Sequence, residues 1–354
     1  MDFGVNMKFL IILFIVFFPV VGFAAEGPYI EGADDFNRTV YEMTEGSFRF
    51  DISDIINEAL DIFTREIKEN VSYLVLFFVL GSVSAVVKLL EFRDKGMVEA
   101  AFFACYTLCA GVALELFSNI LRYAVDITDM MGDFITKLSP VLIGLLLTSG
   151  KAVSASVFHP VLMSAVYVVT LIVKKCIIPL AVYSAVLNIV NNINEQVQIS
   201  SFCKLIGSVS KWILAAAFTL FTGICGIYGF SAPALDVLGA KTIKFAVGSL
   251  VPVVGGFLSD TLETVVSGSI MMKNVVGGAG LFTLCGMCLV PIIKLSVMLL
   301  MIRLSAAIVE PVTDVKIAKL LSDMSGVVTT VFAMVITVSV LFIICISIII
   351  SATG

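Results

Sequence analysis

The sequence contains little charge. Asp, Glu, Lys and Arg make up only 14% of its 354 residues, whereas soluble domains carry about 25%. Hydrophobic residues make up 59%, and the mean hydropathy is +1.09. This composition excludes an ordinary soluble domain. It predicts an all-α fold, a polytopic integral membrane helical bundle, because a membrane helix satisfies its own backbone hydrogen bonds.

The sequence also lacks the motifs of common active sites. It has no phosphate-binding glycine loop, no G-x-S-x-G and no HExxH, and its single histidine is His159. One histidine without a nearby acid or cysteine makes neither a metal site nor a catalytic triad, and we expect a packed or interface residue. The basic residues are scattered, so no nucleic-acid partner is indicated. We expect a protein that is not an enzyme and has no cofactor and no metal.

Cysteine is scarce, and its positions argue against a disulfide framework. None of the eight cysteines lies in the polar stretch 26–70, and all lie in or beside apolar segments. Cys285 and Cys288 have the spacing of a redox motif, but both fall in a predicted membrane helix. We interpret them as small residues that pack between helices.

The N-terminal region is predicted to contain a signal peptide and an acidic segment. Lys8 precedes the apolar run 9–23, and small residues at Gly22 and Ala24 predict a signal peptide over 1–24; an uncleaved signal anchor is the alternative. Residues 26–70 contain four basic and twelve acidic side chains, a net charge of −8 (4 − 12). We expect 25–70 to be an extracytoplasmic segment that ends in an amphipathic helix over about 52–71. That helix either lies on the membrane surface or a partner, or extends the first membrane helix.

Residues 71–125 are predicted to form two membrane helices, over about 71–90 and 98–122. The short connection between them carries Arg93 and Lys95. The positive-inside rule therefore places this connection in the cytoplasm and the N-terminal segment outside.

The remaining sequence contains an internal repeat. Leu138–Gly144 returns as Leu250–Gly256, an offset of 112 (252 − 140), and Cys176–Pro179 returns as Cys288–Pro291 at the same offset. Proline and cysteine are rare here, nine and eight residues, so matched pairs of both indicate a duplication. The repeats are expected over 126–235 and 236–354.

The apolar segments after Pro140 and around Pro252 are too short to cross a bilayer, so each predicts a re-entrant or broken helix. Asp126, Asp129 and Asp133 are expected in an outer loop. Three further crossings in each repeat, with Lys174 at a cytoplasmic turn, would make the repeats inverted. This scheme gives eight full crossings and an external C-terminus, and Lys204 and Lys211 do not fit it.

The candidate site residues lie at these two segments and just after the second one. Asp260 and Glu263 share a helical face, and ionisable groups at membrane depth usually line cavities or pair with one another. The alternative is a cytosolic surface patch in which they pair with Lys273. The candidate pathway or gating residues are Pro140, Gly144, Pro252, Gly255, Gly256, Ser259, Asp260, Glu263, Lys273 and Asn274.

Residues in the same region resemble a known family, the stage III sporulation protein AE family. The resemblance is carried by Lys241–Gly256, with Ser259-Asp260, Glu263–Val265 and Lys273-Asn274, and is supported by Ser149-Gly150, Ser154-Ala155, Phe158–Pro160 and Tyr183–Leu187. It covers about 70–354.

The resemblance implies an integral membrane protein of endospore-forming bacteria, located in the mother-cell membrane around the forespore. The implied partners are other proteins of the SpoIIIA operon, namely a secretion-type ATPase and ring-forming subunits, and through them a forespore partner. Membrane lipid is the remaining partner. The resemblance assigns no catalytic residue.

Three functions follow from these observations. The first is a channel or export-platform subunit of a secretion-like complex, with the two broken helices beside a pathway. The second is a structural membrane scaffold of that complex, without a pathway of its own. The third is an autonomous inverted-repeat secondary transporter.

Overall fold

The computed structural model describes residues 33–45, 52–89, 95–193, 200–250 and 255–351. Outside short turns these residues are helical, and no strand occurs among them. Its elements are α2 (Ala33–Glu45), α3 (Ile52–Leu89), α4 (Lys95–Thr148), α5 (Ala152–Ile172), the π-helix η1 (Val173–Ile177), α6 (Ile178–Ile193), α7 (Ser200–Leu250), α8 (Gly255–Val309) and α9 (Val315–Ser351). The all-α membrane bundle predicted from composition is confirmed.

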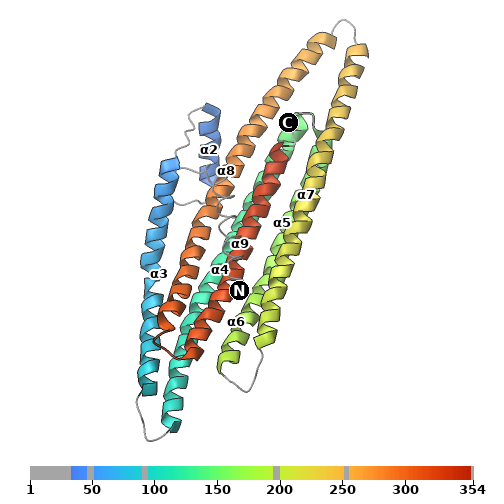
Figure 1. Cartoon of the computed structure of the whole chain (residues 1–354). Helices are drawn as coiled ribbons and strands as arrows, with labels where there is room; N and C mark the ends of the chain where they lie inside the picture. The colour runs from blue at the N-terminus through green and yellow to red at the C-terminus, as the bar shows by residue number, and fades with distance from the viewer. Residues whose placement is uncertain (1–32, 46–51, 90–94, 194–199, 251–254, 352–354) are drawn as a thin grey trace.

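Six long helical units run alternately up and down the bundle: α3, α4, the continuous run α5–η1–α6, α7, α8 and α9 (Figure 1). Each is long and apolar enough to cross a membrane. At 1.5 Å per residue, the 54-residue α4 is about 80 Å long, whereas the hydrocarbon core is only about 30 Å thick. The helices therefore extend well beyond the hydrocarbon core.

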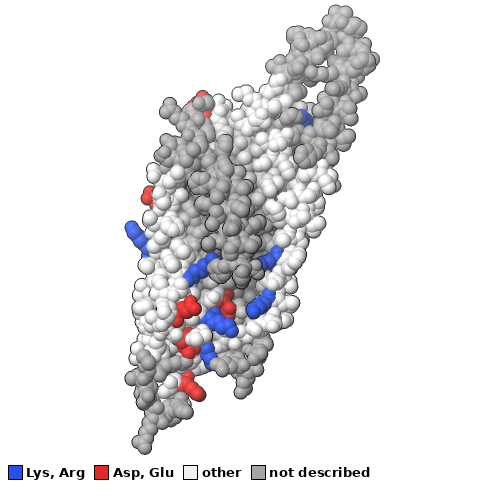
Figure 2. All heavy atoms as spheres, viewed as in Figure 1, with Lys and Arg blue, Asp and Glu red and all other residues white. Residues whose placement is uncertain are grey.

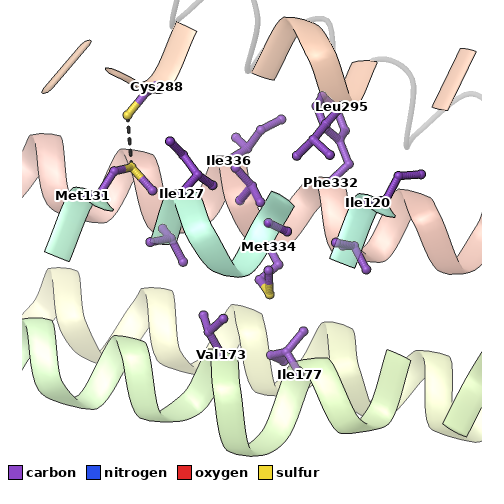
Figure 3. Packing of buried hydrophobic residues seen from close by; sticks show 14 of the residues in the cluster. Ile120, Ile127, Met131, Val173, Ile177, Cys288, Leu295, Phe332, Met334 and Ile336 are labelled. Carbon is purple, nitrogen blue, oxygen red and sulfur yellow. Dashed lines mark hydrogen bonds between the residues drawn. The ribbon is translucent and has the colours of Figure 1, made fainter. Parts of the chain in front are cut away.

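Helix α9 lies at the centre of the bundle. It packs against α8, α4, α6 and α7, and its residues are mostly Val, Ile, Leu, Phe and Met. Figure 3 shows side chains of α4, α8, α9 and η1 converging, among them Ile127, Phe332 and Val173. Met131 Sδ lies 3.2 Å from Cys288 Sγ and 3.6 Å from Ser339 Oγ. The interpretation of Cys288 as a packing residue is confirmed.

Two glycines of α8 allow close approach of neighbouring helices. A Cβ atom at Gly280 would lie 2.5 Å from Leu138 Cδ2, and one at Gly277 would lie 2.6 Å from Ile350 Cγ1. A side chain at either position would require Leu138 of α4 or Ile350 of α9 to shift. Gly150 has a different role: its φ of 75° closes the tight turn between α4 and α5, a conformation that glycine adopts without steric cost.

The predicted amphipathic helix over about 52–71 is not separate from the first membrane helix. Helix α3 runs without a break from Ile52 to Leu89, so the alternative of an extended membrane helix is the one observed. Hydrophobic packing continues across the boundary, because Ile62 and Phe77 are both buried. The signal peptide over 1–24 lies outside the described residues.

The predicted outer loop and broken helix of the first repeat are wrong. Helix α4 continues through Asp126, Asp129 and Asp133 and through Pro140 to Thr148. The acidic residues do not require a loop, because Asp129 pairs with Lys174 of η1, at 2.7 Å. Pro140 removes one backbone donor, but its side chain is exposed on the bundle surface. The predicted turn at Ser149-Gly150 is confirmed.

The predicted cytoplasmic turn at Lys174 is also wrong, since this residue lies in η1 within one continuous helical run from Ala152 to Ile193. Helix α8 likewise runs unbroken through Pro291. Six candidate crossings therefore replace the predicted eight in the described part of the chain. Pro252 lies outside the described residues, and the predicted segment boundaries after residues 70, 125 and 235 fall inside α3, α4 and α7.

The repeats are not arranged as an inverted pair. From Pro140 to Pro252 the chain passes through two long units, α5–η1–α6 and α7, and an even number of passes restores the original direction. Accordingly α6 and α8, which carry the matched Pro179 and Pro291, run in the same direction (Figure 1). The inversion was predicted because Lys174 was expected at a cytoplasmic turn, which gave each repeat an odd number of membrane crossings.

Candidate functional site

A cavity of about 490 Å³ lies between α3, α4 and α8. We call it the α3–α4–α8 cavity. Its lining residues are Glu58, Asp61, Ile62, Arg65, Glu66 and Glu69 of α3, Tyr123, Ile127 and Met130 of α4, and Gly286, Met287, Val290, Pro291 and Lys294 of α8. Its volume lies in the range of small-molecule sites, about 300–1,000 Å³.

An ion pair forms the inner part of this cavity. Lys294 Nζ lies 3.2 Å from Glu66 Oε1, and the Glu66 side chain is only 4% exposed while that of Lys294 is 27% exposed. Lys294 Nζ also lies 5.1 Å from the centre of the Tyr123 ring, within the range of a cation–π contact. Three helices thus meet through one ammonium group.

Asn70 also contacts Glu66. Its Nδ2 donates to the Glu66 carbonyl oxygen at 2.8 Å and, more weakly, to Glu66 Oε2 at 3.4 Å. Asn70 is 5% exposed. Both carboxylate oxygens of Glu66 therefore have a partner, as a buried charge requires.

The mouth of the cavity is acidic. Asp61, Arg65 and Glu69 are exposed, whereas Glu66 is buried below them. The whole lining contains four carboxylates and two cationic side chains, a formal charge of −2 (2 − 4). The cavity is therefore an open, anionic recess with a charged floor.

The spacing of the α3 residues explains how one helix supplies most of the polar lining. Glu58, Asp61, Arg65 and Glu69 are three or four residues apart, so they lie along one side of α3. Helix α8 provides the opposite wall, where Gly286 has no side chain to fill the space. This wall contains Pro291, the residue that the repeat pairs with Pro179.

Other polar contacts also join the long helices, among them an ion pair and an amide–carboxylate hydrogen bond. Asp129 and Lys174 are both 40% exposed, so their ion pair contributes about 0–1 kcal/mol. Asn192 Nδ2 donates to Asp323 Oδ2 at 2.9 Å, which joins α6 to α9. Neither contact lines a cavity of comparable size among the described residues.

Charged side chains are unevenly distributed over the surface. On the face shown in Figure 2, most of the described charged side chains gather over the lower part of the bundle. The turn between α8 and α9 lies toward that lower end (Figure 1). Arg303, Glu310 and Lys319 near this turn are exposed.

The structure separates Pro140 from the predicted pathway residues in the first turns of α8. Leu138, two residues before Pro140, packs against Gly280. Glu263 precedes Gly280 by 17 residues, about 25 Å along α8. The first turns of α8 lie at the end of the α7–α8 hairpin, which extends beyond the rest of the bundle (Figure 1).

The individual positions are as follows. Pro140 and Gly144 are exposed on α4, and nothing lies within 4 Å of a Cβ atom built at Gly144. Gly255, Gly256, Ser259, Asp260, Glu263 and Lys273 belong to α8, and Asn274 is exposed on the same helix. Their pathway role, and the pairing of Asp260 or Glu263 with Lys273, stay predictions.

Sequence reasoning missed the residues at the floor of the cavity. The candidate site residues predicted from the sequence include neither Lys294 nor Glu66 nor Tyr123. The available signal was Lys294 itself, a single charge inside the long apolar run 275–302. A charge at such a position usually has a partner within the protein.

Among the described residues, no group of three or more His, Cys, Asp or Glu side chains is arranged to hold a metal ion. All eight cysteines are free thiols, and seven of them are buried. His159 is exposed on α5, so within one chain it is not a packed core residue.

Comparison with known proteins gives two matches. The family model described as stage III sporulation protein AE matches residues 35–353. The stage III sporulation protein AE of Bacillus subtilis (strain 168) is 29% identical over 316 residues, which cover 89% of this chain and 79% of that relative. No solved structure matches the chain.

Proposed function

The chain belongs to the stage III sporulation protein AE family of sporulation membrane proteins, and on this premise we propose that it is a channel or export-platform subunit of a secretion-like complex. The complex would join mother cell and forespore during endospore development. The protein would lie in the mother-cell membrane around the forespore, with its N-terminal segment extracytoplasmic. Its partners would be the secretion-type ATPase and the ring-forming subunits of the same operon.

The observation that carries this proposal is the α3–α4–α8 cavity. A buried carboxylate and a partly exposed ammonium group form an ion pair between long helices of the bundle. Burying such charges among apolar helices is costly, and in membrane proteins they usually face a cavity or a transport route. A protein that served only to hold others together would have no need of this arrangement.

The proposed route therefore passes between α3, α4 and α8. The tip of the α7–α8 hairpin, with Gly255, Gly256, Ser259, Asp260 and Glu263, is a separate candidate region. Its distance from the cavity argues for a different task, such as contact with a partner subunit. We propose no catalytic residue.

A structural scaffold is the second candidate function, and one observation favours it. The α7–α8 hairpin extends beyond the rest of the bundle (Figure 1), which would suit a docking arm for rings or a motor. The autonomous transporter is not proposed further, because it was based on inverted repeats and corresponding segments of this bundle run in the same direction.

The test is to block the cavity in sporulating cells. Glu69→Cys and Met130→Cys, both at exposed residues of the cavity lining, would be introduced into a chain without native cysteines and treated with membrane-impermeant thiol reagents of increasing size. We expect labelling at both positions, and late forespore gene expression that falls as the attached group grows. Phe77→Cys is the matched control, because Phe77 is fully buried on the same helix as Glu69 and should stay unlabelled.

The two functions give different results in this experiment. A scaffold tolerates a filled cavity, so normal forespore gene expression after complete labelling would refute the pathway. Co-purification of the partner subunits, measured on the same samples, shows whether any defect arises from lost assembly instead.

A further inference from the structure

We propose that Asn192 and Asp323 form a binding site for a hard monovalent metal cation, such as a sodium ion, where α4, α6 and α9 meet. This inference goes beyond the proposed function, because it concerns an ion bound by this chain alone. It does not depend on whether the α3–α4–α8 cavity is part of a pathway. The site would hold the cation with oxygen atoms only.

The first observation is a buried amide oxygen without a partner. Asn192, near the end of α6, is only 5% exposed. Its Nδ2 donates to Asp323 Oδ2 at 2.9 Å, whereas its Oδ1 is buried and accepts no hydrogen bond from any described residue. Burying a carbonyl oxygen in this way is costly, so this atom needs a donor or a cation beside it.

The second observation is a carboxylate that is not neutralised. Asp323 of α9 is half-buried, and it forms no ion pair with the described Lys and Arg side chains. Lys319, one turn earlier on the same helix, is exposed. The hydrogen bond from Asn192 is neutral and leaves the negative charge in place. One bound cation of charge +1 would neutralise it.

The two groups are close enough to share one ion. The nitrogen and oxygen of an amide are about 2.2 Å apart, so Asn192 Oδ1 lies within about 5 Å of Asp323 Oδ2. Oxygen ligands lie about 2.3–2.6 Å from a calcium ion, and a sodium ion has nearly the same radius. A cation between the two oxygens can therefore contact both. A bare ion of this size is smaller than a water molecule and requires no large cavity.

Neighbouring residues supply further oxygen atoms. The Tyr106 hydroxyl of α4 donates to the Ile189 carbonyl oxygen at 2.8 Å and keeps its lone pairs available as acceptors. It lies close enough to Asp323 for an electrostatic interaction. Asn188 precedes Asn192 by one turn, so it lies on the same side of α6, and it is also buried. Neutral oxygens around a single carboxylate suit a hard cation of low charge.

The test is binding of radioactive sodium to the purified full-length protein in detergent, by equilibrium dialysis in choline chloride. We expect saturable binding at one site per chain. Unlabelled sodium chloride should compete, whereas additional choline should not, because its cation is too large to fit between two side chains. Sodium should also raise the thermal unfolding temperature above that in choline at equal ionic strength, because an ion bound only by the folded protein stabilises it.

Two variants locate the site. Asp323→Asn removes the charge but keeps the size of the side chain, and it should weaken sodium binding at least tenfold. Asn192→Leu removes the buried oxygen at similar volume and should weaken binding to a similar extent. Asp129→Asn is the matched control, because it removes a carboxylate that already pairs with Lys174, and it should leave the affinity unchanged.

Absence of saturable sodium binding to the wild-type protein would overturn the proposal, and the buried oxygen would then be satisfied by water alone. Binding that Asp323→Asn and Asp129→Asn weaken equally would also overturn it, since that pattern indicates general attraction of cations to acidic side chains. If Asp323→Asn does not fold, the comparison of Asn192→Leu with Asp129→Asn decides in the same way.

Discussion

At the scale of residues, the most consequential contact is the ion pair between Glu66 and Lys294. Each charge loses water on burial, and the loss is offset only while the partner, Asn70 and Tyr123 remain in place. The pair joins α3 to α8 through two residues that are 228 positions apart in the sequence (294 − 66). Its contribution to the stability of the folded protein becomes visible when one partner is removed and the other charge stays without a counter-charge.

Glu66→Gln is expected to destabilise the folded protein by about 1–3 kcal/mol, because Lys294 then lies partly buried without a counter-charge. The figure is lower than for a fully buried pair, since Lys294 is 27% exposed. The double variant Glu66→Gln/Lys294→Met should recover most of this loss. Denaturant unfolding in detergent checks both; a double variant as unstable as the sum of the single ones would exclude direct coupling.

The ion pair between Asp129 and Lys174 should behave differently. Both side chains are 40% exposed, so solvent screens their attraction. We expect Asp129→Asn to change the stability by less than about 0.5 kcal/mol. A loss of several kcal/mol in the same unfolding assay would show that this pair holds η1 in place.

At the scale of elements, helix contacts depend on small residues more than on polar ones. At Gly277 and Gly280 of α8, side chains of α9 and α4 occupy the space that a Cβ atom would need. Close backbone approach increases van der Waals contact, which is the main attraction between helices in lipid. Gly144 has no such neighbour, although the sequence pattern gives it equal prominence.

Gly280→Ala should therefore destabilise the bundle by about 1–3 kcal/mol, as an overpacked interface does, because its Cβ atom would lie 2.5 Å from Leu138 Cδ2. Gly144→Ala is the matched control and should be neutral or slightly stabilising. Thermal unfolding of both variants in detergent measures the difference. Equal effects would mean that α4 moves freely relative to α8 at this level.

At the scale of the whole molecule, six crossings change the expected topology. The ends of α3 and α6 and the starts of α4 and α7 gather at one end of the bundle (Figure 1). Lys88, Lys95 and Lys204 lie at these ends. Lys204, which did not fit the predicted inverted scheme, therefore lies at the same end of the bundle as the other two basic residues. From the positive-inside rule we expect this end to lie in the cytoplasm.

Fusion reporters test this arrangement. Reporters after Gly150 and after Leu250 should report the same side of the membrane, and a reporter after Glu310 should report the opposite side. The reason is that α4 and α7 run in the same direction. Opposite sides for Gly150 and Leu250 would restore the inverted repeat and contradict the six-helix bundle.

Part of the candidate site was open to prediction from the sequence. The 3–4 residue spacing of Glu58, Asp61 and Arg65 predicts one polar side of a helix, and α3 has it. Their partner on α8 could not be predicted, because it depends on which helix lies opposite. The predicted pathway at Pro140 failed for a related reason: a proline kinks or breaks a helix only where the lost hydrogen bond and the ring cannot be accommodated, and an exposed position accommodates both.

The sequence by itself determined that this protein is an all-helical membrane bundle and to which family it belongs, and it indicates an internal duplication. These properties follow from composition, from repeated prolines and cysteines, and from local sequence similarity. Only the tertiary structure decided the number of crossings, the relative direction of the repeats and the location of the charged cavity. The physical reason is that a charged residue in an apolar stretch, such as Asp129 or Lys294, predicts a loop or a surface position when only its sequence neighbours are known. A partner of opposite charge on a distant helix allows the same residue to lie within a continuous helix.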